Sequence, residues 1–97
     1  MSEYQIRNGI VLEEILGRYL LISTEVARDK CVYIKAVEPL VAFYWEMMEQ
    51  GLSISDMADQ ASKVFKGVER DVLIGDIKDL IAEMKEYGYL LKDDEIE

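Results

Sequence analysis

The stretch KCVYIKAVEPLVAFYWEMM, residues 30–48, joins a strand pattern to an apolar helix pattern at one proline. Residues 31–37 alternate as a β-strand does, which predicts two opposite sets of side chains: Val32, Ile34 and Ala36 on one face, and Cys31, Tyr33 and Lys35 on the other. Pro39 disfavours helical geometry at Glu38, while its fixed φ suits the first turn of a helix. We therefore predict that strand and helix meet with almost no linker.

The helix that begins at Pro39 should end near Gln50, because Gly51 is a good C-terminal cap. Its apolar residues cover most sides, so other elements must cover it. We interpret its methionines and aromatic residues as core and not as a cofactor site: Leu40, Val41, Phe43, Tyr44, Trp45, Met47 and Met48.

The remaining elements are marked by turn and cap signals. After the turn Asn8-Gly9, residues 10–16 and 19–22 read as two antiparallel strands, and the polar residues 23–30 read as a loop or a single helical turn. A second helix starts at Ser53, in a capping box with Asp56, and a third spans residues 69–87. Three strands followed by three helices predict an α+β domain with helices on one face of a small three-stranded antiparallel sheet.

The length of 97 residues and the 51% hydrophobic content predict one compact domain. We expect its core to span residues 9–91 and residues 92–97 to form a flexible acidic tail. The apolar runs are much shorter than the ~20 residues of a membrane span, and the N-terminus lacks a signal pattern. These features indicate a cytoplasmic protein.

The composition argues against catalysis. The chain has no histidine and one cysteine, which excludes an internal disulfide and removes the commonest general base and metal ligand. We interpret Cys31 as a small, half-buried strand residue. The sequence thus predicts no enzyme activity, no catalytic residue, no metal and no cofactor.

The third helix divides into three sectors at about 100° per residue. The core stripe is Leu73, Ile77, Leu80, Met84 and Tyr87; one flank carries Arg70, Ile74, Lys78, Ile81 and Lys85; the opposite side carries Asp71, Asp76, Asp79, Glu83 and Glu86. The basic flank is either a solvated surface with helical ion pairs or the rim of a groove for an acidic, apolar peptide. Beside it, the third strand is a candidate sheet edge that an extended peptide could join by β-augmentation.

Taken together, these segments resemble the PqqD-like family, the precursor-peptide recognition elements of ribosomally made, post-translationally modified peptide (RiPP) pathways. The resemblance covers about residues 9–91 and rests on the order and spacing of GIVLEE (9–14), LGRYLL (16–21), VYI (32–34), AFYWE (42–46), SISDMA (53–58) and YGYLL (87–91).

The resemblance implies a winged-helix-like, non-catalytic domain that binds the leader segment of a precursor peptide and presents it to a modifying enzyme. That enzyme is usually a radical S-adenosylmethionine protein. By position, the leader would add as a strand to the third strand, beside the third helix. The implied peptide-binding residues are Cys31, Val32, Tyr33, Ile34, Lys35, Ala36, Arg70, Ile74, Ile77, Lys78, Ile81 and Lys85.

Two other functions stay open. A winged-helix regulator could bind DNA through the lysines and arginines of the last two helices, although a net charge of −9 opposes contact with a polyanion. A dimerising adaptor could instead pair the edge strand with a second copy to form a homodimer.

Overall fold

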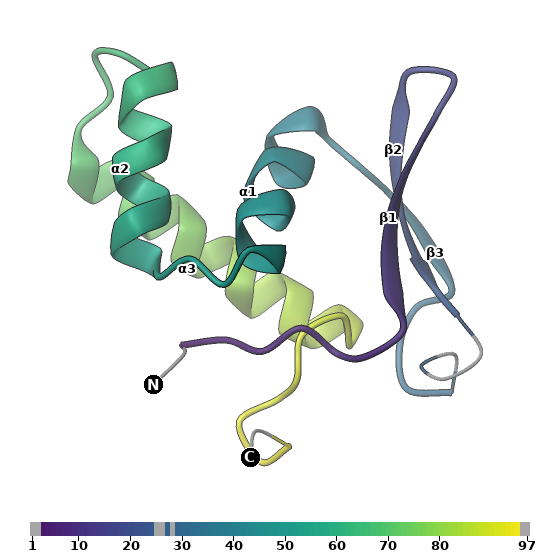
Figure 1. Ribbon diagram of the computed structural model, residues 1–97. Helices are drawn as coiled ribbons and strands as arrows, with labels where there is room; N and C mark the ends of the chain where they lie inside the picture. Colours follow the sequence, from purple (N-terminus) through teal and green to yellow (C-terminus); the bar gives the residue numbers. More distant parts are fainter. Residues whose placement is uncertain (1–2, 25–26, 28, 96–97) are drawn as a thin grey trace.

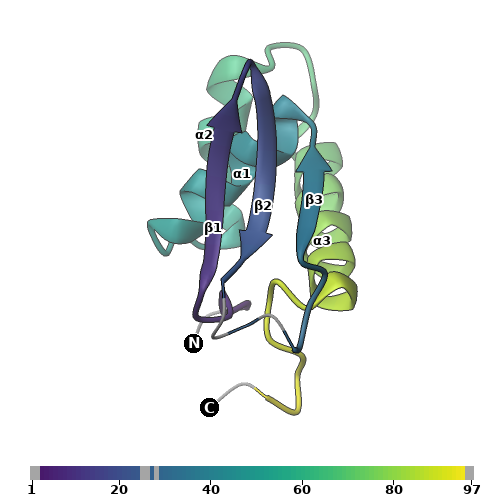
Figure 2. The same cartoon turned by 90° about the vertical axis from the view of Figure 1, so that its right-hand side faces the viewer.

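The structure, a computed structural model, describes residues 3–24, 27 and 29–95. Three strands come first, β1 (Ile10–Ile15), β2 (Arg18–Ser23) and β3 (Ile34–Val37), and three helices follow, α1 (Pro39–Glu49), α2 (Ile54–Val64) and α3 (Arg70–Tyr87). The strands form one antiparallel sheet in the order β1-β2-β3, and the three helices lie on one of its faces (Figures 1 and 2). The predicted α+β class with this element order is confirmed.

The first hairpin turn lies one residue earlier than the sequence predicted, at Leu16-Gly17 instead of Gly17-Arg18. Strand β1 ends at Ile15 and β2 begins at Arg18, so that Leu16 and Gly17 alone form the turn. Both turn residues have positive φ, 52° and 79°, which is the geometry of a two-residue hairpin turn that matches the twist of its strands. In the predicted loop 23–30, Ser23 ends β2, and residues 25, 26 and 28 lie outside the described residues.

Capping residues set the helix boundaries. Pro39 occupies the first turn of α1 directly after β3, as the strand-to-helix junction predicted. The hydroxyl of Ser53 accepts a hydrogen bond from the backbone N–H of Asp56 at 3.0 Å, which confirms the N-terminal cap of α2. Gly88 ends α3 in the left-handed conformation at φ 87°.

The hydrophobic core is centred on α1, which lies between the sheet and α2 (Figure 1). Trp45 of α1, Leu21 of β2 and Ile77 of α3 have no exposed surface. The rings of Trp45 and Tyr89 meet edge to face with their centroids 6.5 Å apart. The predicted covering of α1 on most sides is explained by its position, because the sheet packs on one side of it and α2 on the other.

The turn after α3 connects three parts of the chain. The backbone N–H of Val32 donates to the carbonyl of Tyr87 at 3.1 Å, and the backbone N–H of Arg7 donates to the carbonyl of Tyr89 at 3.0 Å. The Arg7 guanidinium also donates to the carbonyl of Gly88 at 2.6 Å, and Arg7 is only 8% exposed. The segment that leads into β3 is therefore attached to the end of α3.

Residues 92–95 contact the body of the domain. Glu95 forms an ion pair with Arg7 at 2.7 Å, and Asp93 forms one with Lys85 at 2.8 Å. The hydrogen bond from Arg7 is the largest of the effects that lower the pKa of Glu95. Residues 96 and 97 of the predicted tail lie outside the described residues.

Replacing Gly88 by alanine should destabilise the protein strongly. A Cβ at this position would overlap the carbonyl oxygen of Lys30 and lie 2.6 Å from the Cβ of Cys31, in a backbone conformation that L-residues rarely adopt. We expect Gly88→Ala to lower the free energy of unfolding in urea by more than about 2 kcal/mol. Gly51→Ala is the matched control, because Gly51 has φ 80° with open space around it, and it should cost about 1 kcal/mol. Equal losses would contradict the contact.

Tyr89 should make stability fall at alkaline pH. Burial raises the pKa of Tyr89 to about 12, with smaller contributions from Cys31 and Tyr87. The unfolded chain releases this proton near pH 10, so the stabilisation is complete below pH 10 and is lost as the pH rises toward 12. We expect the free energy of unfolding to fall less steeply above pH 10 in Tyr89→Phe than in the wild type. Parallel pH profiles would contradict the assignment.

Candidate functional site: the groove between β3 and α3

Strand β3 has one paired edge and one open edge. It pairs with β2 from Tyr19↔Val37 to Ile22↔Ile34, and β2 continues to β1 on its other side. Within the described residues, no strand pairs with the outer edge of β3, and the C-terminal end of α3 lies near this strand (Figure 1). The predicted edge strand is present in the sheet.

The pairing pattern identifies which backbone groups the open edge offers. Ser23 donates its N–H to the carbonyl of Tyr33 at 2.8 Å, so the backbone groups of Tyr33 point toward β2. Hydrogen-bonded and non-hydrogen-bonded pairs alternate along an antiparallel ladder. The N–H and C=O groups of Ile34 and Ala36 therefore point outward, where an incoming strand could pair with them.

The strand is shorter than predicted, which is a correction to the sequence analysis. The predicted strand begins at Cys31, but β3 begins at Ile34, and Cys31 and Val32 bond to other parts of the chain. The Cys31 thiol donates to the carbonyl of Ala27 at 3.0 Å, and the Val32 N–H is already bonded to α3. Of the six predicted edge residues, only Ile34, Lys35 and Ala36 lie in the strand.

The groove itself consists of a cavity between β3, α1 and α3 and an adjoining cavity between α1 and α3. One has a volume of about 300 Å³ and the other about 170 Å³, and both are lined by Val41 and Glu83. The larger is completed by Lys35, Ala36, Val37, Glu38 and Met84, and the smaller by Leu40, Tyr44, Asp76, Asp79 and Leu80. The open strand edge forms one wall of the larger cavity, which is suitable for an extended peptide, and the smaller cavity adds the apolar side chains of Leu40, Val41 and Leu80.

The charged groups around this groove are mostly acidic. Four carboxylates, those of Glu38, Asp76, Asp79 and Glu83, line the two cavities with a single ammonium, that of Lys35. The negative charge also reaches the floor of the groove. The pKa of buried Tyr44 is raised, first by burial and then by the charge of Asp76.

The basic flank of α3 lies away from the groove. Arg70 pairs with Asp59 of α2 at 3.0 Å and also donates to Ser55 of that helix. Lys85 pairs with Asp93 of the C-terminal segment, and Lys78 is exposed. None of these three basic residues lines either cavity beside β3.

The predicted isoleucines of α3 serve the core. Ile77 has no exposed surface, Ile81 is 6% exposed, and half-buried Ile74 packs against the core. These isoleucines pack α3 against the core. A peptide in the groove would contact Leu80 and Glu83 instead. Helical periodicity places Ile81 on the basic flank of α3. The structure instead buries this side chain in the core. Adding Ile81 to the stripe shifts the buried face toward the basic side, and on the other border of the stripe Glu83 lines the cavity beside β3.

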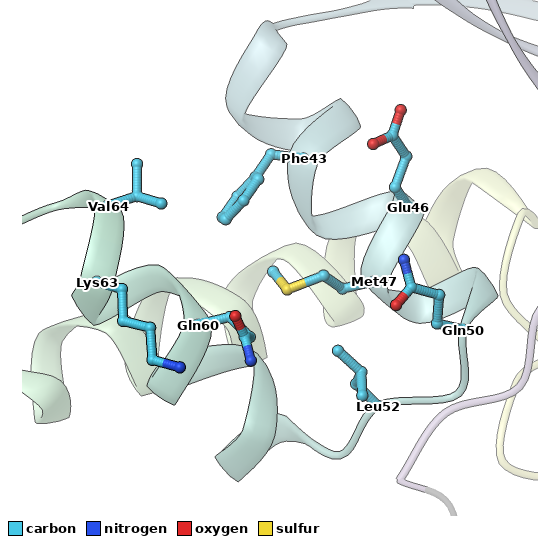
Figure 3. Close-up of a pocket in the computed structure, with 8 residues that line it drawn as sticks. All are labelled: Phe43, Glu46, Met47, Gln50, Leu52, Gln60, Lys63 and Val64. Carbon is cyan, nitrogen blue, oxygen red and sulfur yellow. The ribbon is translucent and has the colours of Figure 1, made fainter.

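The structure has another cavity, of about 420 Å³, between α1 and α2. Figure 3 shows side chains of both helices around it, and they include Phe43, Met47 and Leu52 together with Lys63 and Gln60. It has no strand edge. In the described part of the chain, no group of three histidine, cysteine or acidic side chains could hold a metal ion. No helix of that part is long and apolar enough to cross a bilayer.

Comparison with known proteins identifies the fold. No protein-family model and no curated protein matches the sequence. Among solved structures, TbiB1 in complex with the TbiA(beta) leader peptide matches with a TM-score of 0.74 and 15% identity, over 90% of this chain and 94% of that chain. Lasso peptide synthetase B1 complexed with the leader peptide matches with a TM-score of 0.73 and 22% identity, over 94% of this chain and 100% of that chain. The chain thus shares its fold with these two solved proteins.

Proposed function

We propose that this protein captures the leader segment of a ribosomally made precursor peptide and presents it to a modifying enzyme. The leader adds as a fourth strand to the outer edge of β3, against the wall formed by α3. The observation that carries the proposal is the open edge of β3 beside a groove, in a fold shared with two solved complexes with leader peptides.

The groove offers the two kinds of contact that bind an added strand, backbone hydrogen bonds and side-chain pockets. Backbone pairing at Ile34 and Ala36 provides affinity for any extended chain, and pockets for alternate side chains provide selectivity. Exposed apolar side chains lie next to the edge, since Val32 is 42%, Ile34 48% and Leu40 41% exposed. An added strand would cover part of this surface, which contributes favourable free energy of about 25 cal/mol per Å².

The proposal assigns no catalytic role to this chain. The modifying enzyme supplies the chemistry, and the sequence resemblance favours a radical S-adenosylmethionine enzyme in the cytoplasm as the partner. The two structural neighbours are B1 proteins bound to leader peptides, and one is named as part of a lasso peptide synthetase, so an enzyme of that pathway is the alternative partner. Copurification of this chain with the modifying enzymes encoded beside it distinguishes the two.

The other two candidate functions are less well supported. Arg70 and Lys85, which would contact DNA phosphates, are engaged in ion pairs, and the groove side of α3 is acidic. Self-pairing through β3 would use the same open edge as the leader. Light scattering with and without a bound leader distinguishes a homodimer from a monomer that binds peptide.

Placing a proline at position 36 should impair leader binding without unfolding the domain. Ala36→Pro removes an outward N–H that does not pair with β2, and edge strands tolerate proline. We expect the affinity for labelled leader peptides encoded beside the gene to fall at least about tenfold in fluorescence anisotropy, because a guest carbonyl loses its donor and meets the ring.

Glu14→Pro is the matched control for this experiment. The N–H of Thr24 donates to the carbonyl of Gly9, so by the same alternation Glu14 directs its backbone groups to the free edge of β1, on the far side of the sheet. This variant should bind leader as the wild type does. Equal binding by all three proteins, or equal loss in both variants, would contradict strand addition at β3.

A further inference from the structure

We propose that the groove between β3 and α3 selects leader segments that carry lysine or arginine side chains on the face turned toward α3. The inference rests on the proposed function and adds the charge class of the peptide. It reverses the expectation from the sequence, in which the basic flank of α3 suited an acidic peptide.

The first argument is the charge of the groove. Four carboxylates and one ammonium line its two cavities, as described above. Asp76, Asp79 and Glu83 are exposed, and among the described residues the ion pairs join Arg7 to Glu95, Arg70 to Asp59 and Lys85 to Asp93. The groove carboxylates therefore have no ion-pair partner within the described residues, and a cationic guest would supply one.

The second argument is the position of the single cation. The ammonium of Lys35 lies 4.6 Å from the centroid of the Tyr87 ring, which is a favourable cation–π geometry. Tyr87 is one helical turn beyond Glu83, next to the point where Val32 closes the edge of the strand. The Lys35 charge is thus held at one end of the groove, and the section beside Asp76 and Asp79 is lined by carboxylates without a basic residue.

The third argument is position. Figure 1 shows that α3 nears the sheet at its C-terminal end, and Glu83 lines both cavities. Asp79 and Asp76 precede Glu83 on α3 by about one and two helical turns. A basic side chain of a peptide on β3 would therefore meet Glu83 first, and the adjoining cavity adds the carboxylates of Asp76 and Asp79.

The test uses peptides selected by the protein itself. An mRNA-display library of random peptides is selected on the full 97-residue chain, and the bound pool is sequenced. We expect enrichment of lysine and arginine over the starting library, and an affinity that falls with added salt. Enrichment of aspartate and glutamate, or no charge preference, would overturn the inference.

Two matched pairs of neutralising substitutions locate the effect. Asp76→Asn with Glu83→Gln removes two charges from the groove and should weaken the selected peptides by about three- to tenfold. Asp71→Asn with Glu86→Gln removes two exposed charges from α3 at residues that line neither cavity, and should change affinity less than about twofold. Equal weakening by both pairs would mean that net charge alone acts, and would overturn the inference.

The Ala36→Pro variant separates this inference from the proposed function. If Ala36→Pro releases the selected peptides and neutralising the groove does not, strand addition is supported and the charge selectivity is overturned. If the selected peptides bind Ala36→Pro as tightly as the wild type, they do not use the β3 edge, and both the inference and the proposed function are overturned.

Discussion

The attachment of the β3 lead-in segment to the C-terminal turn of α3 is the constraint on which the groove depends. Gly88 allows the backbone at Lys30 and Cys31 to approach α3 more closely than any residue with a Cβ would permit, and the Val32 N–H bonds to the helix end. This contact fixes the start of β3 beside α3. Because the strand continues directly into α1 through Pro39, its far end is fixed as well.

An open strand edge normally favours aggregation, and this chain limits that edge at both ends. Hydrogen bonding to Tyr87 occupies Val32, and the carbonyl of Glu38 accepts a bond from Ala42 inside α1. Between these points, the outward groups of Ile34 and Ala36 remain for a guest. A short edge with one long helix beside it restricts how a peptide can enter, and short or covered edges are a common protection against unwanted pairing.

The charged side chains give the groove a selectivity that backbone hydrogen bonds alone do not provide. The chain carries a net charge of −9, and Arg7, Arg70 and Lys85 form ion pairs on other surfaces. Glu38 and Glu83 beside β3, and Asp76 and Asp79 in the adjoining cavity, have no ion-pair partner within the described residues. Long-range attraction would speed the encounter with a cationic segment, and the apolar floor around Val41 and Leu80 would hold it after water is excluded.

The sequence by itself determined the element order, the strand-to-helix junction at Pro39, the cap at Ser53 and the end of α3 at Gly88, because these depend on local backbone preferences. Tertiary structure alone decided that β3 begins at Ile34 and that Glu83, from the acidic side of α3, lines the cavity beside it. Helical periodicity shows that both flanks of α3 border its core stripe. Only the burial of Ile81 against the core sets the rotation of the helix, and that contact depends on residues distant in the sequence.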